Sequence, residues 1–178
     1  AQVMQKALSS TEEEIDIHHA GTAMRFLTSY FAIQEGRTTV LTGSERMKQR
    51  PIQYLVDALR ILGADIEYIG EEGFPPLKIV GKKLQHSKTQ ISANVSSQFI
   101  TSLLLIGGKL ENGLELELIG EITSRSYLEM TLKMISEAHI QAEFIGNKIV
   151  VHPYEKIGTK SHVIPFEVES DWSSASYF

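Results

Sequence analysis

Small polar residues and one arginine stand at the starts of the helices that the sequence predicts. They are Gly21 and Thr22, Ser96, Ser97 and Gln98, Ser124, and Arg50 just before its helix. A helix N-terminus attracts anions because it carries unpaired amide hydrogens and a partial positive charge. Glycine permits close approach, hydroxyls add donors, and a guanidinium can donate two parallel hydrogen bonds to an oxyanion. The pattern indicates a site for negatively charged groups.

Each of these residues also has a simpler structural interpretation. A serine at a helix start is usually an N-cap, and capping is the favoured explanation for Ser96 or Ser124 taken alone. Gly21 alone is typical of a turn, and we interpret Arg25 as structural, with Asp171 as its candidate partner. Anion binding is favoured because the same chemistry recurs at four helix starts.

Other kinds of chemistry find no support in the sequence. His18 and His19 adjoin at a predicted strand end, where neighbouring side chains face opposite ways, and no ligand cluster has metal-binding spacing. The chain has no cysteine, and it lacks the glycine-rich dinucleotide and Walker motifs. We therefore expect no metal and no cofactor.

The elements that position these residues occur twice in the same order. The first set is predicted as a strand at 15–17, a helix at 21–33, a strand at 38–41, a helix at 51–62, and strands at 65–69 and 77–80. The second set is predicted as a strand at 90–93, a helix at 97–105, a strand at 114–119, a helix at 127–138, and strands at 141–145 and 148–151. The fold class is therefore α/β, with two βαβαββ units.

Hydrophobic periodicity supports these elements. One helical face carries Ile52, Leu55, Val56, Leu59 and Leu62. Pro51 suits the first position of that helix, where no amide hydrogen is needed. Leucine and glutamate alternate over 114–118, as in a strand with one buried face. The segments Gly70–Gly73 and Gly146–Asn147 predict a hairpin at the end of each unit.

Composition narrows the class of protein. The chain has 178 residues, is 42% hydrophobic and carries a net charge of −5, which argues against general nucleic-acid binding. No apolar run reaches membrane-spanning length, and the first residues do not resemble a secretory signal. With no cysteine, the chain suits a cytoplasmic protein, and we expect no membrane partner.

The two ends of the chain read as parts of interrupted elements. Residues 1–14 are interpreted as the remnant of a preceding helix with its connection, followed by units at 15–84 and 85–156. The end of residues 157–178 is interpreted as an acidic and hydroxyl-rich cap followed by the first turn of a helix. We therefore expect a fragment of a longer protein, cut at both ends.

Five short segments resemble motifs of the 5-enolpyruvylshikimate-3-phosphate synthase family. His19–Arg25 is similar to "NAGTAMR", and Leu41–Pro51 is similar to "LTG-x-x-RMxxRP". Val95–Phe99 contains "SSQF", Ser124–Tyr127 resembles "SKPY", and Asp171–Phe178 resembles "DASSASYF". The matches follow the family's order and extend over nearly the whole chain.

The resemblance implies an enolpyruvyl transferase fold, an inside-out α/β barrel in which each of two domains contains three βαβαββ units. It implies transfer of the enolpyruvyl group of phosphoenolpyruvate to the 5-hydroxyl of shikimate 3-phosphate, without a cofactor, in aromatic amino acid biosynthesis. The family is the target of glyphosate. Residues 157–178 would then be a crossing segment into the second domain. The catalytic acid and base would lie in that domain, so we expect this chain to be inactive alone. The missing first unit would leave apolar surface, so we expect the chain to be prone to self-association, and the full-length enzyme to be a monomer.

The resemblance also assigns binding roles by motif. For shikimate 3-phosphate the assigned residues are Ser96, Ser97, Gln98, Ser124 and Tyr127; for phosphoenolpyruvate they are Gly21, Thr22, Arg50 and Gln98. His19 departs from the usual asparagine, and Phe26 departs from the usual proline. Two alternatives stay open: a UDP-N-acetylglucosamine enolpyruvyl transferase, which usually carries a loop cysteine absent here, and a non-catalytic repeat module.

Overall fold

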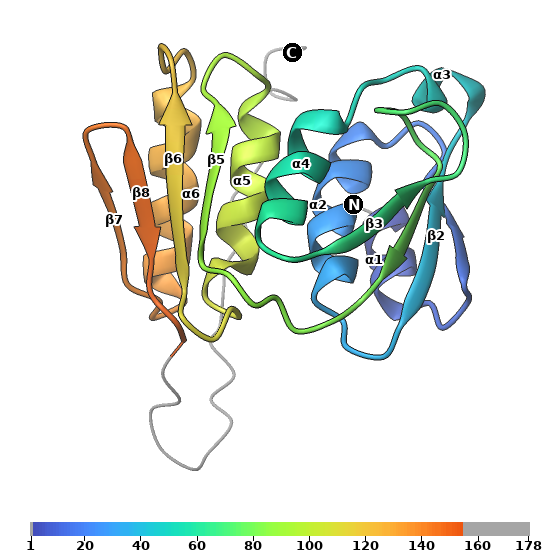
Figure 1. Cartoon of the computed structure of the whole chain (residues 1–178), viewed down its shortest axis with the longest axis horizontal. Helices are drawn as coiled ribbons and strands as arrows, with labels where there is room; N and C mark the ends of the chain where they lie inside the picture. Colours follow the sequence, from blue (N-terminus) through green and yellow to red (C-terminus); the bar gives the residue numbers. More distant parts are fainter. Residues whose placement is uncertain (1, 155–178) are drawn as a thin grey trace, which may run out of the picture.

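The computed structural model describes residues 2–154, which form two four-stranded sheets and the helices that pack on them. In Figure 1 the two sheets lie on opposite sides of the molecule, with helices between them. Residues 157–178, predicted as a crossing segment, lie outside the described residues, as does the motif Asp171–Phe178. No helix among residues 2–154 combines the length and the apolar character that crossing a membrane requires.

The first sheet and its helices occupy the N-terminal half. After helix α1 (Gln2–Ser9), the elements are β1 (Glu14–Asp16), α2 (Gly21–Ala32), β2 (Thr38–Thr42), α3 (Glu45–Lys48), α4 (Gln53–Ile61), β3 (Asp65–Tyr68) and β4 (Leu77–Val80). The strand order is β1-β2-β4-β3. β1 and β2 are parallel, and β4 is antiparallel to both of its neighbours.

The second sheet repeats this plan. Its elements are β5 (Lys88–Ser92), α5 (Ser97–Gly107), β6 (Leu114–Ile119), α6 (Arg125–Glu137), β7 (Ala142–Ile145) and β8 (Lys148–Val151). The strand order β5-β6-β8-β7, with β5 and β6 parallel, matches that of the first sheet. The predicted α/β class with repeated βαβαββ units is thereby confirmed.

Burial explains why these sequences adopt these elements. In β6 the leucines at 114, 116 and 118 are buried while Glu115 and Glu117 are partly exposed, as alternation across a pleated strand requires. In α4 the buried side chains include Leu55, Val56 and Leu59, which lie on one helical face. Helix α5 is apolar on most sides because it packs against α2, α4 and α6.

Buried hydroxyl groups join the two units. The Oγ atoms of Ser29 in α2 and Ser102 in α5 lie 2.6 Å apart, and Ser102 Oγ donates to the carbonyl oxygen of Arg25 at 2.7 Å. Thr89 Oγ1 in β5 donates to the carbonyl oxygen of Ala58 in α4 at 2.8 Å. The units therefore share one interior in which these polar groups are paired.

Two local predictions were wrong or incomplete. Pro51 is not the first helical residue, because α4 begins at Gln53 and the amide of Ile52 instead donates to the carbonyl oxygen of Gly73 at 2.9 Å. Helix α3 was not predicted, since its four residues bury only Met47 and give no helical periodicity. The first hairpin pairs as expected, but its loop extends over residues 69–76.

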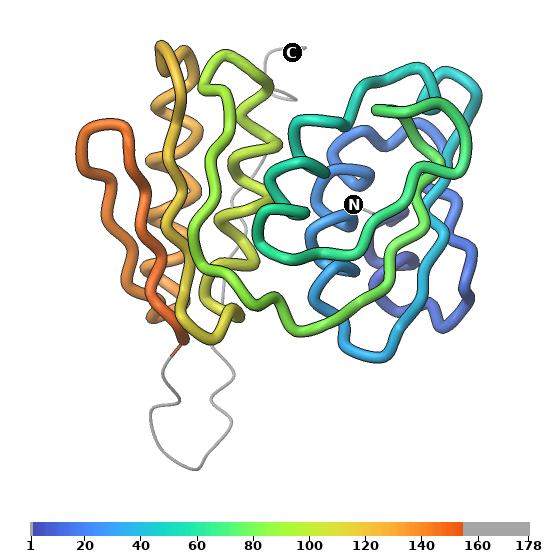
Figure 2. Tube along the Cα trace, viewed as in Figure 1, coloured from blue at the N-terminus to red at the C-terminus, as the bar shows by residue number. Residues whose placement is uncertain are grey.

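Helices α2, α4, α5 and α6 all begin at one edge of the molecule. Each begins after a strand of a parallel pair and runs back along the sheet. Their starts lie along the upper edge in Figure 1, and the chain trace in Figure 2 shows the connections into α5 and α6 at that edge. Four partial positive charges are therefore gathered on one side of the molecule.

Candidate anion-binding site

Gly21, the first residue of α2, lies directly against two guanidinium groups. A Cβ atom added at Gly21 would lie 2.5 Å from Nη1 and 3.2 Å from Cζ of Arg50, and 3.6 Å from Nη1 of Arg25. Any larger residue would therefore displace Arg50. A small pocket at this point is lined by Gly21, Met24, Arg25, Met47, Arg50, Pro51 and Ile52.

Arg25 is held by contacts from the second unit. Its Nη1 donates to Oε1 of Gln98, and its Cζ lies 5.0 Å from the centroid of the Phe99 ring. The guanidinium is half-buried, and burial, followed by the charge of Arg50, lowers the pKa of Arg25 from its ordinary value. Sequence reasoning assigned Arg25 only a structural role and missed this pairing with Gln98, a predicted site residue.

Within the described part of the chain, no nearby carboxylate balances the positive charge of the two arginines. Among residues 2–154 no aspartate or glutamate oxygen lies within 4.0 Å of a guanidinium nitrogen of Arg25 or Arg50. Arg125, at the corresponding place in the repeat, is instead paired with Glu129 at 2.8 Å. Two adjacent cations of this kind favour binding of an anion between or beside them.

The serines at the starts of α5 and α6 do not act as ordinary caps. Ser96 and Ser124 occupy the N-cap positions, but neither side chain accepts a hydrogen bond from its helix. By contrast, Ser44 Oγ accepts from the amide of Met47 at 3.3 Å and so caps α3. The capping interpretation of Ser96 and Ser124 is therefore wrong for their side chains, and among residues 2–154 neither hydroxyl has a hydrogen-bond partner.

The predicted site residues fall into two groups. Gly21, Arg50 and Gln98 are linked through Arg25, as described above. Ser124 is the N-cap of α6, and the largely exposed Tyr127 lies in the first turn of that helix. Helix α6 is joined to α5 through the Oγ1 atoms of Thr101 and Thr131, which lie 3.2 Å apart.

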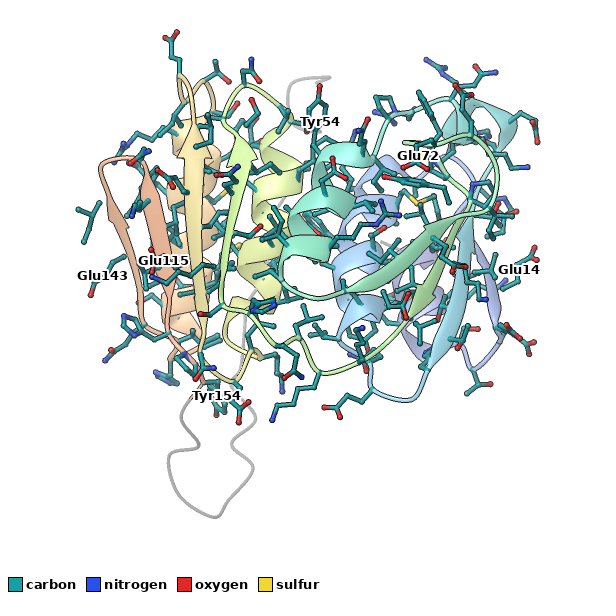
Figure 3. The ribbon with its side chains drawn as sticks, in the orientation of Figure 1. Glu14, Tyr54, Glu72, Glu115, Glu143 and Tyr154 are labelled. Atoms are coloured by element: carbon teal, nitrogen blue, oxygen red, sulfur yellow. The ribbon has the colours of Figure 1, made fainter. Side chains whose placement is uncertain are left out.

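Two further predicted residues lie in the first turns of α2 and α5. Thr22 is exposed in the first turn of α2, and Ser97 is partly exposed in the first turn of α5. Figure 3 shows Tyr54, which sequence reasoning missed, at the edge where α4 and α5 begin, and Tyr154 at the opposite edge. The centroid of the Tyr54 ring lies 6.5 Å from that of Phe99, the ring against which the Arg25 guanidinium packs.

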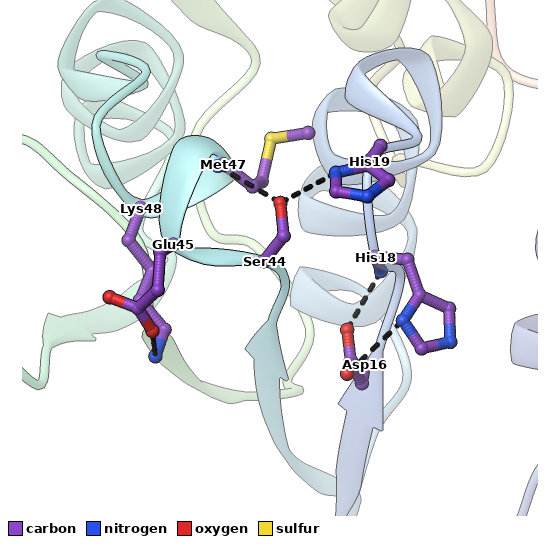
Figure 4. A network of polar contacts seen from close by, with 7 residues as sticks. All are labelled: Asp16, His18, His19, Ser44, Glu45, Met47 and Lys48. Carbon is purple, nitrogen blue, oxygen red and sulfur yellow. Dashed lines mark hydrogen bonds and ion pairs between the residues drawn. The ribbon is translucent and has the colours of Figure 1, made fainter.

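The adjacent histidines turn to different partners (Figure 4). Nδ1 of His19 lies 2.8 Å from Oγ of Ser44, which ties the start of α2 to the start of α3. His18 has a positive φ of 51°, and its amide donates to Oδ1 of Asp16 at 2.7 Å. Among residues 2–154 no three His, Asp or Glu side chains gather as a metal site requires.

A larger cavity, of about 510 Å³, lies near the opposite ends of α2 and α5. It is lined by Tyr30, Ile33, Gln34, Glu35, Lys82, Lys83, Leu84, Leu105, Ile106, Lys109, Leu110 and Glu111. Helix C-termini carry partial negative charge, and Nζ of Lys83 already pairs with Glu111 at 2.9 Å. This cavity is therefore less suited to an anion than the edge where the helices begin.

The fold and the site define an α/β repeat protein that gathers helix N-termini, serine hydroxyls and two guanidinium groups at one edge. Residues 2–178 match the family model described as EPSP synthase (3-phosphoshikimate 1-carboxyvinyltransferase), and the chain belongs to this family.

Several named proteins are similar to this chain. The 3-phosphoshikimate 1-carboxyvinyltransferase of Bacteroides fragilis (strain YCH46) is 51% identical over 180 residues, which cover 99% of this chain and 42% of that protein. The enzyme of the same name from Haemophilus influenzae (strain PittEE) is 45% identical, with coverage of 90% and 37%. A solved EPSP synthase from Acinetobacter baumannii has a TM-score of 0.67 at 26% identity, covering 83% of this chain and 32% of that chain.

Proposed function

We propose that this chain forms part of an enzyme that transfers the enolpyruvyl group of phosphoenolpyruvate to shikimate 3-phosphate. The observation that carries the proposal is the pair of guanidinium groups, without a carboxylate partner among residues 2–154, beside Gly21 and Gln98 at the edge where four helices begin. The membership of this chain in the EPSP synthase family supports this function. The chain spans 42% of the length of the Bacteroides relative, so the activity belongs to the longer protein.

The proposed binding roles follow from the available donors. Ser96, Ser97 and Ser124 bind the phosphate of shikimate 3-phosphate, and Tyr127 lines the pocket for its ring. This role fits hydroxyls at helix starts that make no capping bond. For phosphoenolpyruvate the proposed residues are Gly21, Thr22 and Arg50, with Gln98 between the two substrates.

The proposed reaction explains why such a site needs several donors. The 5-hydroxyl adds to C2 of protonated phosphoenolpyruvate, and loss of phosphate from the tetrahedral intermediate gives the enol ether. Preoriented cations and helix ends hold two phosphates and a carboxylate together while charge develops. This chemistry needs no metal or organic cofactor.

The proton-transfer groups are proposed to lie in the part of the relatives that this chain does not span. The chain alone is then expected to show no turnover with both substrates in an assay of phosphate release, and substantial turnover would contradict this. The division into units at 15–84 and 85–156, the crossing segment at 157–178 and a cytoplasmic location belong to the same proposal.

Ligand-dependent thermal stability tests the substrate class. Shikimate 3-phosphate is expected to raise the Tm of the chain, and UDP-N-acetylglucosamine is expected to leave it unchanged. The substitution Ser97→Ala should reduce the shift, whereas Ser136→Ala, on an exposed residue near the far end of α6, should not. A shift with the UDP-sugar alone would favour the related transferase.

A further inference from the structure

The amide of Gln98 is oriented by its contact with Arg25. Nη1 of Arg25 can only donate, because a guanidinium has no hydrogen-bond acceptor. The atom of Gln98 that faces it is therefore Oε1, as the structure has it, and not Nε2. The two N–H donors of Nε2 are left for other partners, and within residues 2–154 the Gln98 side chain makes no second hydrogen bond.

Arg25 is itself fixed at both ends. Its carbonyl oxygen accepts from Oγ of Ser102, which in turn lies 2.6 Å from Oγ of Ser29. Its guanidinium lies against the Phe99 ring, 5.0 Å from the centroid. Both serines are at most 1% exposed, so the hydrogen bonds that join Ser29, Ser102 and the Arg25 carbonyl lie within the packed interior between α2 and α5.

We propose that Arg25 is a positioning residue that acts through Gln98. It keeps Oε1 occupied, so that Gln98 offers only N–H donors to the anionic substrate. The proposal rests on the proposed function, in which Gln98 contacts both substrates. An amide free to rotate would present its oxygen to the anion in part of the population, and that arrangement would repel the ligand.

A direct test is the side-chain amide signal of Gln98 in a ¹⁵N-correlated NMR spectrum of the 178-residue chain. In the native chain the two Nε2 protons are expected to differ from those of solvated glutamines, because the amide is held. Arg25→Ala should move them to solvated values, and Arg25→Lys, which keeps a donor, should restore part of the difference. An unchanged Gln98 signal in Arg25→Ala would overturn the proposal, whether or not any ligand binds.

A double-mutant cycle with inorganic phosphate and with phosphoenolpyruvate separates positioning from direct binding. Arg25→Ala alone should weaken binding about tenfold, the loss expected for one hydrogen bond to a charged group. In a Gln98→Ala background the same substitution should have less than half that effect on a logarithmic scale. A full tenfold loss in both backgrounds would show that Arg25 binds the anion itself, and would overturn the positioning role.

Failure of the proposed function and failure of the positioning role of Arg25 give different results. If the native chain shows no phosphate-dependent shifts at Gly21, Ser97 or Gln98, the proposed function fails, while the ligand-free Gln98 signal still decides the role of Arg25. Lys133→Ala, an exposed position on α6, serves as the matched loss of one positive charge and is expected to change neither readout.

Discussion

At the scale of the residue, the proposed site depends on a glycine that has no room for a side chain. Gly21→Ala places a methyl group 2.5 Å from Nη1 of Arg50 and so forces the guanidinium to move. Its φ does not lie in the left-handed region, and alanine is the better helix former, so the stability of the fold should not fall. We expect phosphate or phosphoenolpyruvate affinity to drop about tenfold, with an unchanged Tm.

Isothermal titration with phosphoenolpyruvate and thermal unfolding of the same samples measure the two effects. Gly70→Ala is the matched control, because an added Cβ there would meet only Cδ of Pro76, at an ordinary 3.9 Å. Unchanged affinity in Gly21→Ala would show that the position of Arg50 does not matter for the ligand.

Residue types and spacing could identify some members of the candidate site but not how they are held. Gly21, Ser97 and Arg50 stand at helix starts, and their chemistry is visible in the sequence. The pairing of Arg25 with Gln98 joins residues 73 positions apart, so no local pattern reveals it. The missing cap bond of Ser96 depends on backbone angles, here φ −53° and ψ 127°, which composition does not determine.

At the scale of the element, the two units are held together by paired hydroxyls between α2 and α5. Because Ser102 Oγ donates to Arg25 O, its contact with Ser29 is one in which Ser29 donates. Ser102→Ala removes both bonds and leaves a buried hydroxyl unpaired, which should cost about 1–3 kcal/mol. Ser29→Ala removes one bond and should cost less.

Urea unfolding of the single variants and of the double variant checks this order. The double variant should be more stable than the sum of the two single losses predicts. It lacks the Ser29 hydroxyl, so it does not bury the unpaired group that destabilises Ser102→Ala. Strict additivity would contradict a stabilising contact between the two hydroxyls.

A second element-scale prediction concerns the sheet formed by β5, β6 and β8. Glu115 lies 2.8 Å from Nζ of Lys88 and 3.6 Å from Nζ of Lys148. The hydrogen bond from Lys88, followed by the charges of both lysines, lowers the pKa of Glu115 below its ordinary 4.5. The resulting stabilisation is present above that value and is lost as the pH falls through the lower pKa of the folded state.

The difference in unfolding free energy between the native chain and Glu115→Gln should therefore be largest at neutral pH and shrink as the pH falls below 4.5. It should be small, because all three side chains are partly exposed. Glu137→Gln, on an exposed residue at the end of α6, is the control. A difference that grows toward acid would show that Glu115 is not stabilised in its charged form.

Elements with strong periodicity were predictable, and elements without it were not. The buried leucines of β6 and the apolar face of α4 identify both elements from the sequence. Helix α3 has only four residues, and Ile52 uses its amide to bind the β3–β4 loop, so the start of α4 was misplaced. A tertiary hydrogen bond, which no local pattern encodes, set the start of α4, whereas α3 is too short to show a helical period.

At the scale of the whole molecule, one helix presents an apolar stripe. On α6, Tyr127, Met130 and Met134 are 60%, 54% and 44% exposed and lie at helical spacing. We expect the chain alone to self-associate through this stripe. Sedimentation velocity should show a concentration-dependent dimer, and the double substitution Met130→Lys and Met134→Lys should give a monomer. A native chain that stays monomeric at high concentration would contradict this.

A crystal structure of the chain with shikimate 3-phosphate tests the central claim most directly. The account predicts the phosphate at the edge where α5 and α6 begin, within hydrogen-bonding distance of the hydroxyls of Ser97 and Ser124. A phosphate bound instead in the cavity lined by Lys82 and Lys109, near the opposite helix ends, would contradict it.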